Sequence, residues 1–332
     1  MLINFFNDLI NFIQYKKKEN LYSNLVFIEG EYLIPYLIYL INKKKKLAII
    51  TFEKISLDKK IDTYCFKTFL FKSLFFNLVK VKKIYSSTPD LNNSIFTRSI
   101  NKNVKYIYIQ HSPVSLSMAY KKNAFDNFDG VQVVNEYQFS DLVDINKLNN
   151  KKIKAIRTKY FFLQNFKKKK DFKSKKVLIA PTWNTEFYKN KIHTKLKEIL
   201  EKNKIEFELR PHKMSYTKNE FDLGELEKSF TINKDIYCDY SNFSNLITDW
   251  SGIFIEFSLL QNTRAICVNT KKKIRNIKFN DFTRTPIEID LRDKLAHNID
   301  FKDINNIPDI ILSENQKDIE IIESLKNKFF FT

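Results

Sequence analysis

Residues 246–257 have the sequence LITDWSGIFIEF, which is the most informative stretch of the chain. A short apolar run ends at small polar residues, and apolar residues then resume at a helical spacing. The pattern predicts a buried strand, a tight turn and the start of a helix. Ser251 and Gly252 form the tip of the turn, where backbone N–H groups at a helix start can bind an anion. Gly252 is one of only four glycines in 332 residues, so we interpret the turn as a phosphate site.

The rest of the chain predicts two domains of the α/β class. A length of 332 residues exceeds one ordinary domain, and an apolar content of 43% can fill two cores. Apolar strands alternate with helical segments in both halves, which indicates mainly parallel sheets covered on both faces. We expect two Rossmann-like domains that face each other across a cleft, over residues 1–165 and 166–315, and a closing helix over 316–332. The polar segment 167–176 is the candidate linker.

The expected elements follow from these patterns. Strands are expected at residues 24–28, 47–52, 83–87, 105–110, 130–134, 176–180, 205–209, 246–249 and 264–268. Helices are expected at residues 32–42, 65–79, 189–203, 319–329 and from the turn at 251 to residue 260.

The net charge of +19 favours an anionic partner. The lysine runs at 43–46 and 167–170 lack the interleaved aromatic residues of a nucleic-acid module, so we expect solvated surface and no nucleic-acid partner. A non-catalytic protein that binds polyanions or nucleic acid is the competing class, and it predicts steeply salt-dependent binding.

The sequence lacks several motifs that mark membrane insertion, secretion, metal binding or nucleotide binding. There is no apolar window long enough to span a bilayer and no signal-peptide pattern at the start. Three cysteines, far apart, suit neither a disulfide framework nor a zinc site. No P-loop, no GxGxxG and no carboxylate pair at a strand end is present. We therefore expect a cytoplasmic protein with no metal and no cofactor.

Four polar clusters follow predicted strands, where open parallel sheets bind their ligands. They are Gln110-His111-Ser112-Pro113, Pro181-Thr182-Trp183, Arg210-Pro211-His212 and Thr248-Asp249-Trp250-Ser251-Gly252. Two of the four histidines of the chain lie in these clusters. Together the clusters predict one site at the ends of several strands.

Each candidate residue has a functional and a structural interpretation. His111 could act as a general base or hydrogen-bond a loop carbonyl. Arg210 and His212 suit a phosphate-binding pair, or Pro211 between them simply sets the loop. Thr182 could donate to the same anion or cap the next helix. Glu256 could bind a ribose diol or be a solvated helix residue.

The four clusters resemble those of the CDP-glycerol:glycerophosphate glycerophosphotransferases of teichoic-acid and capsule synthesis, over roughly residues 100–270. The resemblance implies a GT-B fold and a transferase that moves glycerol phosphate or a related polyol phosphate from a CDP-linked donor. It implies a polyol-phosphate or glycan acceptor in cell-surface polymer synthesis, and a peripheral location at an anionic membrane, on its inner face. It also implies that His111 is the general base and that His212, Thr182 and Ser251 contact the donor phosphates.

The sequence departs from that family at three positions. Gly252 replaces a second serine, Ser112 replaces a glycine after the histidine, and Glu256 replaces an aspartate. The departures leave open a different CDP-alcohol, or a GT-B glycosyltransferase for surface polysaccharide that uses a nucleotide sugar of the CMP-sialic acid, Kdo or UDP-sugar type.

The start of the chain is amphipathic. Apolar residues at positions 2, 3, 5, 6, 9, 10 and 12 precede three lysines at 16–18. This pattern is compatible with a helix that lies on a membrane and with a helix that packs in the core.

Overall fold

The computed structural model describes residues 2–55, 57, 61–93, 95–160, 176–183, 186–235, 238–313 and 316–331. The chain divides into two compact units. The first comprises residues 1–111 and 120–162, and the second comprises residues 112–119 and 163–331. The boundary predicted at residue 165 and all but the last residue of the predicted linker lie outside the described residues, so both stay predictions.

The first unit contains a seven-stranded parallel sheet in the order β3-β2-β1-β4-β5-β6-β7. Its strands are β1 (Asn24–Ile28), β2 (Leu47–Thr51), β3 (Thr63–Cys65), β4 (Lys83–Ser86), β5 (Lys105–Tyr108), β6 (Gly130–Val133) and β7 (Lys154–Arg157). Its helices are α1 (Leu2–Lys18), α2 (Ile34–Lys43), α3 (Phe69–Leu78) and α4 (Glu136–Leu148), with short 3₁₀ turns η1 (Glu19–Leu21) and η2 (Glu31–Leu33).

Alternation along β1 explains why helices cover both faces of this sheet. Val26 and Ile28 belong to the cluster that contains Leu37 of α2. Phe27 lies between them and contacts Phe76 of α3, with ring centroids 5.0 Å apart. Because successive side chains of a strand point to opposite faces, a fully apolar strand needs a cover on each side.

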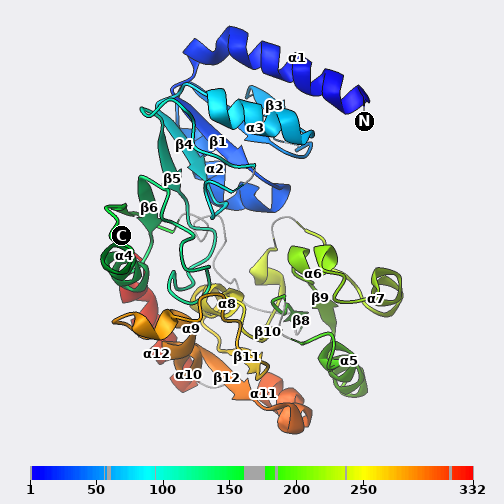
Figure 1. Ribbon diagram of the computed structural model, residues 1–332. Coiled ribbons are helices and arrows are strands. Elements are labelled where there is room, and N and C mark those ends of the chain that lie inside the picture. The colour runs from blue at the N-terminus through cyan, green and yellow to red at the C-terminus, as the bar shows by residue number, and fades with distance from the viewer. Residues whose placement is uncertain are drawn as a thin grey trace. The chain divides into compact units, whose positions relative to one another are not determined.

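The second unit contains a five-stranded parallel sheet in the order β12-β11-β10-β8-β9. Its strands are β8 (Val177–Ile179), β9 (Phe207–Leu209), β10 (Asn245–Thr248), β11 (Ala265–Val268) and β12 (Ala296–Ile299). Its helices are α5 (Ile192–Lys202), α6 (Lys213–Thr217), α7 (Leu223–Ser229), α8 (Ile253–Gln261), α9 (Ile287–Asp290), α10 (Arg292–Leu295), α11 (Ile307–Leu312) and α12 (Gln316–Phe329), with η4 (Tyr240–Asn242), η5 (Phe279–Asp281) and η6 (Phe301–Asn306). Figure 1 shows both sheets and the helices around them.

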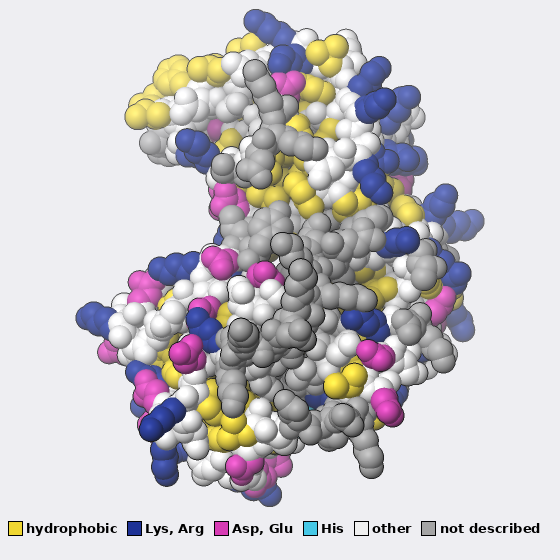
Figure 2. Space-filling model, turned by 180° about the vertical axis from the view of Figure 1, so that it is seen from behind, with side chains coloured by type: hydrophobic (Ala, Val, Ile, Leu, Met, Phe, Trp, Pro, Cys, Tyr) yellow, Lys and Arg dark blue, Asp and Glu magenta, His cyan; other side chains and the backbone are white. Residues whose placement is uncertain are grey.

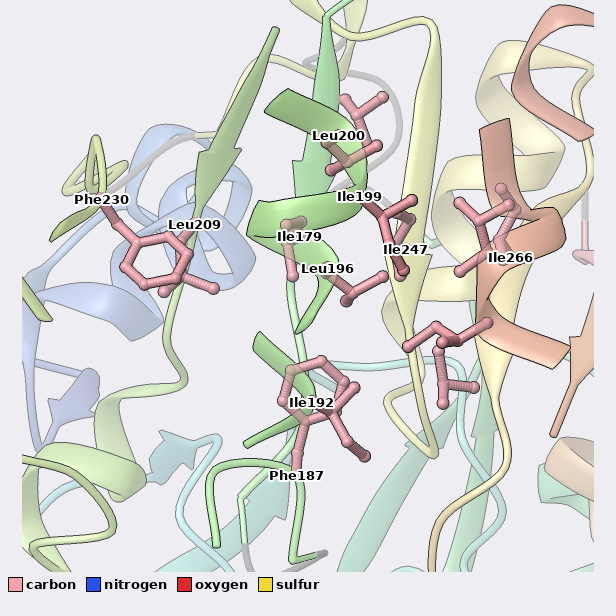
Figure 3. Packing of buried hydrophobic residues seen from close by; sticks show 14 of the residues in the cluster. Ile179, Phe187, Ile192, Leu196, Ile199, Leu200, Leu209, Phe230, Ile247 and Ile266 are labelled. Carbon is pink, nitrogen blue, oxygen red and sulfur yellow. The ribbon is translucent and has the colours of Figure 1, made fainter. Parts of the chain in front are cut away.

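The core of the second unit lies where α5 packs on the sheet. Leu196 and Leu200 of α5 join Ile179, Ile247 and Ile266 from three adjacent strands (Figure 3). Helix α8 is buried on most sides, and seven of its nine residues are buried. No helix among the described residues is both long enough and apolar enough to cross a bilayer.

The two parallel sheets confirm the predicted fold class of two Rossmann-like α/β domains, and they fit a GT-B-like fold. The sequence patterns missed β3, β7 and β12, each of which lies at an edge of its sheet. Edge strands are short and half-exposed, so they lack the continuous apolar run that marks a central strand. The helix predicted from residue 65 begins only at Phe69, because Cys65 pairs with Thr51 in the sheet.

Candidate functional site

The topology of the second sheet brings the predicted clusters of this unit to one edge. Strands β11, β10, β8 and β9 are consecutive neighbours and parallel, so their carboxyl ends point the same way. The segments that follow β8, β9 and β10 are three of the four predicted clusters. The segment after β11, residues 269–275, is a fourth contributor that the sequence analysis did not select.

Asp249 and Thr248 fix the junction between β8 and β10. The backbone N–H of Thr182 donates to Asp249 Oδ1 at 2.8 Å. Thr248 Oγ1 donates to the carbonyl of Ala180 at 2.7 Å. Asp249 and Thr248 are fully buried, and Thr182 is 2% exposed. The contact gives Asp249 the role of bracing the loop that carries Thr182.

Lys273 adds a cation directly at Thr182. Its Nζ donates to Thr182 Oγ1 at 2.7 Å and lies 4.7 Å from the ring centroid of Trp183. Burial lowers the pKa of the Lys273 ammonium to about 8, and Arg275 lowers it further, although Asp249 opposes the shift. Because the hydroxyl of Thr182 accepts from Lys273, its own proton is directed to another acceptor.

Both tryptophans of the chain lie at strand ends beneath cations. Lys273 and Arg275 lie 4.7 and 5.5 Å from the ring centroid of Trp183, measured from the charged group. Lys272 and Arg292 lie 5.7 and 4.0 Å from the ring centroid of Trp250. The negative face of an aromatic ring attracts a cation that lies over it, so these contacts favour ordered cationic side chains. The edge of the sheet is therefore electropositive and suits an anionic ligand.

The turn after β10 leads into α8 at Gly252. This residue has φ −60° and ψ −11°, so its backbone is ordinary and does not itself require glycine. A Cβ at Gly252 would lie 2.4 Å from Val114 Cγ1 and 2.5 Å from Ser112 Oγ. Glycine is needed here because the segment 112–119 packs directly against the turn. Ser112 Oγ thus lies beside Gly252 at the start of α8.

Backbone and side-chain bonds hold the segment 112–119 in the second unit. The N–H of Ser115 donates to Glu288 Oε1 at 3.0 Å, and Asn276 Nδ2 donates to the carbonyl of Ser117 at 2.9 Å. The N–H of Arg275 donates to the carbonyl of Met118 at 3.0 Å. Burial raises the pKa of the Glu288 carboxyl.

His212 and Arg210 each make hydrogen bonds within the protein, and their role as a phosphate-binding pair stays a prediction. His212 Nδ1 accepts from the N–H of Met214 at 3.1 Å and so caps α6. A neutral His212 therefore carries its proton on Nε2, which can donate to an anion. The imidazole also lies beside Trp183, with centroids 6.3 Å apart. Arg210 donates to Asn233 Oδ1 at 2.6 Å and to the carbonyl of Asp235 at 2.7 Å, and these bonds hold the 233–235 segment near β9.

His111 lies in the first unit, in an aromatic environment at the end of β5. Its Nδ1 is 3.0 Å from the hydroxyl of Tyr108, and that hydroxyl donates to Tyr120 at 3.1 Å. The Tyr108 oxygen is left to accept from Nδ1–H, which places the imidazole lone pair on Nε2. This tautomer is the one that a general base at Nε2 requires.

Glu256 is 4% exposed and accepts a hydrogen bond from the hydroxyl of Tyr240 at 3.1 Å. The interpretation as a solvated helix glutamate is therefore wrong. The contact with Tyr240 gives the carboxylate a partner inside the protein, and its binding to a ribose stays a prediction.

Lys273 was not predicted from the sequence because it ends the run Lys271-Lys272-Lys273, a pattern typical of solvated surface. The rule applied to the other clusters could have found it, because the run follows the predicted strand 264–268.

No protein-family model matches the chain, and no curated protein matches its sequence. Similar solved structures include MurG of Acinetobacter baumannii, with a TM-score of 0.44 and 10% identity over 92% of this chain and 95% of that chain. The glycotransferase of kitacinnamycin has a TM-score of 0.46 and 8% identity over 92% and 95%. UDP-N-acetylglucosamine 2-epimerase from Rickettsia bellii has a TM-score of 0.43 and 10% identity over 92% and 98%. These similarities are too distant to assign a function, so the function proposed below rests on the residues of this chain.

Proposed function

We propose that the second unit binds the diphosphate of a nucleotide-linked donor and that the protein is a transferase. The observation that carries the proposal is the contact of Lys273 with Thr182 at an electropositive sheet edge, beside the start of α8. The ammonium supplies charge, and the hydroxyl of Thr182 and the Nε2–H of His212 supply directed donors. The backbone N–H groups at Gly252 and the hydroxyl of Ser251 add the donors of a helix N-terminus.

The finer proposal is transfer of glycerol phosphate, or a related polyol phosphate, from a CDP-linked donor. His111 Nε2 removes the proton of an acceptor hydroxyl, whose oxygen attacks the β-phosphorus of the donor. The new P–O bond forms as the bond to the bridging oxygen breaks, and CMP leaves with that oxygen. Lys273 and the hydroxyl donors stabilise the charge that develops on the leaving group. Arg210 contributes by holding the loop after β9 in place.

The acceptor in this proposal is a polyol phosphate or glycan of a cell-surface polymer. The enzyme would act in the cytoplasm at the inner face of the membrane, where anionic lipid attracts a protein of net charge +19.

A melting assay with CDP, CMP, UDP and AMP tests the proposal. We expect cytidine nucleotides to raise the melting temperature, by about 2.7 kcal/mol of stabilisation when the ligand is at one hundred times Kd. Lys273→Met and Thr182→Val should each weaken the binding of CDP by about tenfold or more, because each removes one donor to an ionised phosphate. Lys271→Met is the matched control, since Lys271 belongs to the same run and is exposed.

The outcomes separate the classes of function. A preference for UDP would replace the CDP-alcohol with a nucleotide sugar. No stabilisation by any nucleotide, together with salt-dependent binding of polyanions, would replace the transferase with a non-catalytic binding protein.

A further inference from the structure

Helix α1 leaves a set of large apolar side chains exposed to solvent, whereas the acidic side chain of Asp8 faces the protein. Six large apolar residues of α1 are exposed: Leu2 (72%), Ile3 (76%), Phe5 (39%), Phe6 (55%), Ile10 (52%) and Ile13 (44%). We call these six residues the α1 patch. In contrast, Asp8 is 1% exposed and Tyr15 is fully buried. An ordinary surface helix has the opposite orientation, with its apolar stripe toward the core.

Hydrogen bonds of the inward face fix this orientation. The carboxylate of Asp8 accepts from the backbone N–H groups of Lys67 at 3.0 Å and Thr68 at 2.7 Å, and from Thr68 Oγ1 at 2.6 Å. Asn11 Nδ2 donates to the carbonyl of Cys65 at 3.1 Å. These bonds hold the residues immediately before α3, and rotating α1 to bury its apolar stripe would break them.

The α1 patch forms a continuous stripe. Positions 2, 6, 10 and 13 follow one another at intervals of three or four residues, so they lie along one line of the helix. The same line continues at Lys17, which is exposed. Helix α3 packs against α1, with Phe71 and Phe5 centroids 5.3 Å apart, and it adds exposed Phe69 and Leu70. Figure 2 shows hydrophobic side chains gathered along this edge of the first unit, at the upper left of the view.

The charges on the exposed side of α1 are all positive. Its ten exposed residues within 2–18 comprise the six of the α1 patch, the amides Asn7 and Gln14, and the lysines Lys17 and Lys18. None of them is a carboxylate, although Lys18 also pairs with Asp62 at 2.9 Å. An apolar stripe that ends in cations matches the boundary of an anionic bilayer, with acyl chains below and phosphate groups above.

We propose that α1 lies flat on an anionic lipid bilayer, with the α1 patch inserted among the acyl chains and Lys17 at the phosphate groups. A second copy of this chain is a poorer occupant, because two molecules of net charge +19 repel each other, whereas anionic lipid attracts them. This inference rests on the membrane location in the proposed function and names the surface that would contact the lipid. The experiment that tests it does not depend on the identity of the donor.

Sedimentation of the full chain with vesicles tests the surface. The probes are vesicles of phosphatidylcholine alone and vesicles that also contain phosphatidylglycerol. We expect binding to the anionic vesicles, and we expect the double variant Phe6→Glu/Ile10→Glu to lower the apparent affinity by at least about tenfold. Ile277→Glu is the matched control, because Ile277 is 86% exposed but lies in the second unit. It should bind vesicles as the unchanged chain does.

A melting curve and the nucleotide assay complete the design. The double variant replaces exposed residues only, so its melting temperature and its stabilisation by CDP should be unchanged. Equal vesicle binding by the double variant and the unchanged chain would contradict the proposal that the α1 patch binds lipid. The proposal would also be wrong if the unchanged chain is a dimer without lipid and the double variant is a monomer, because the patch would then bind a second copy. Loss of the CDP response in every form of the protein would instead count against the proposed function alone.

Discussion

Replacing Gly252 with alanine measures how closely the segment 112–119 packs on the phosphate turn. The added Cβ would lie 2.4 Å from Val114 Cγ1, about 1.1 Å inside the roughly 3.5 Å at which two carbon atoms normally touch. The second close atom, Ser112 Oγ at 2.5 Å, can move by rotation about its Cα–Cβ bond. Valine is stiff about χ1, so Val114 or the backbone beneath it must shift.

Two opposing terms set the magnitude. The backbone of Gly252 is right-handed, so alanine alone would stabilise the fold by about 0.4–1 kcal/mol through the unfolded state. Overpacking a tight contact costs about 1–3 kcal/mol. The overpacking term is larger, and we expect Gly252→Ala to lower the free energy of unfolding by about 1–2 kcal/mol.

Equilibrium urea denaturation followed by tryptophan fluorescence is the assay. The chain has only two tryptophans, Trp183 and Trp250, and both lie in the second unit, so the signal reports the unit that contains Gly252. Gly224→Ala is the control. Gly224 lies in the first turn of α7, and its Cβ would lie 3.4 Å from Oδ1 of the N-cap residue Asp222, an ordinary contact, so the substitution should stabilise the unit by about 0.5–1 kcal/mol.

A rescue makes the test specific. Val114→Ala removes the blocking methyl group and should restore most of the stability lost in Gly252→Ala. The reasoning is refuted if Gly252→Ala is as stable as the unchanged chain, or if Val114→Ala only adds its own loss without coupling to the first substitution.

Three further predictions follow from other parts of the molecule. CDP binding should weaken as the pH rises through about 8, because the Lys273 ammonium loses its proton there. Isothermal titration calorimetry at several pH values measures this. Lys273→Arg should remove the pH dependence, because arginine stays charged. His111→Ala should lower kcat by about 10²–10⁴-fold. Tyr108→Phe removes the acceptor of the Nδ1–H of His111, so it should lower kcat less and shift the pH profile of kcat. Normal turnover by the His111→Ala variant would exclude His111 as the base. Asp8→Ala should destabilise the first unit by about 1–3 kcal/mol, because the N–H groups of Lys67 and Thr68 lose their acceptor. Urea denaturation followed by circular dichroism measures this, and an unchanged midpoint would show that those bonds contribute nothing.

Much of the site followed from chain-local patterns. Thr182, His212 and Ser251 each follow an apolar strand, and in a parallel sheet that position places a residue at the ligand-binding edge whatever the rest of the chain does. Lys273 obeys the same rule, yet the two residues before it are also lysines, and its contact with Thr182 distinguishes it from them. The contacts of Arg210 with Asn233 and Asp235 could not be predicted from the sequence, because those residues lie 23 and 25 positions further along the chain, and its binding of phosphate stays a prediction.

The sequence by itself determined the two α/β domains, the central strands and the clusters at their ends, because strand burial and turn chemistry are local properties. Only the tertiary structure decided why residue 252 is glycine, since Val114 and Ser112 approach it from more than a hundred residues away in the chain. Only the tertiary structure decided the orientation of α1 as well. The apolar periodicity of residues 2–13 is compatible with a buried and with an exposed stripe, and the hydrogen bonds of Asp8 to Lys67 and Thr68 fix the exposed orientation.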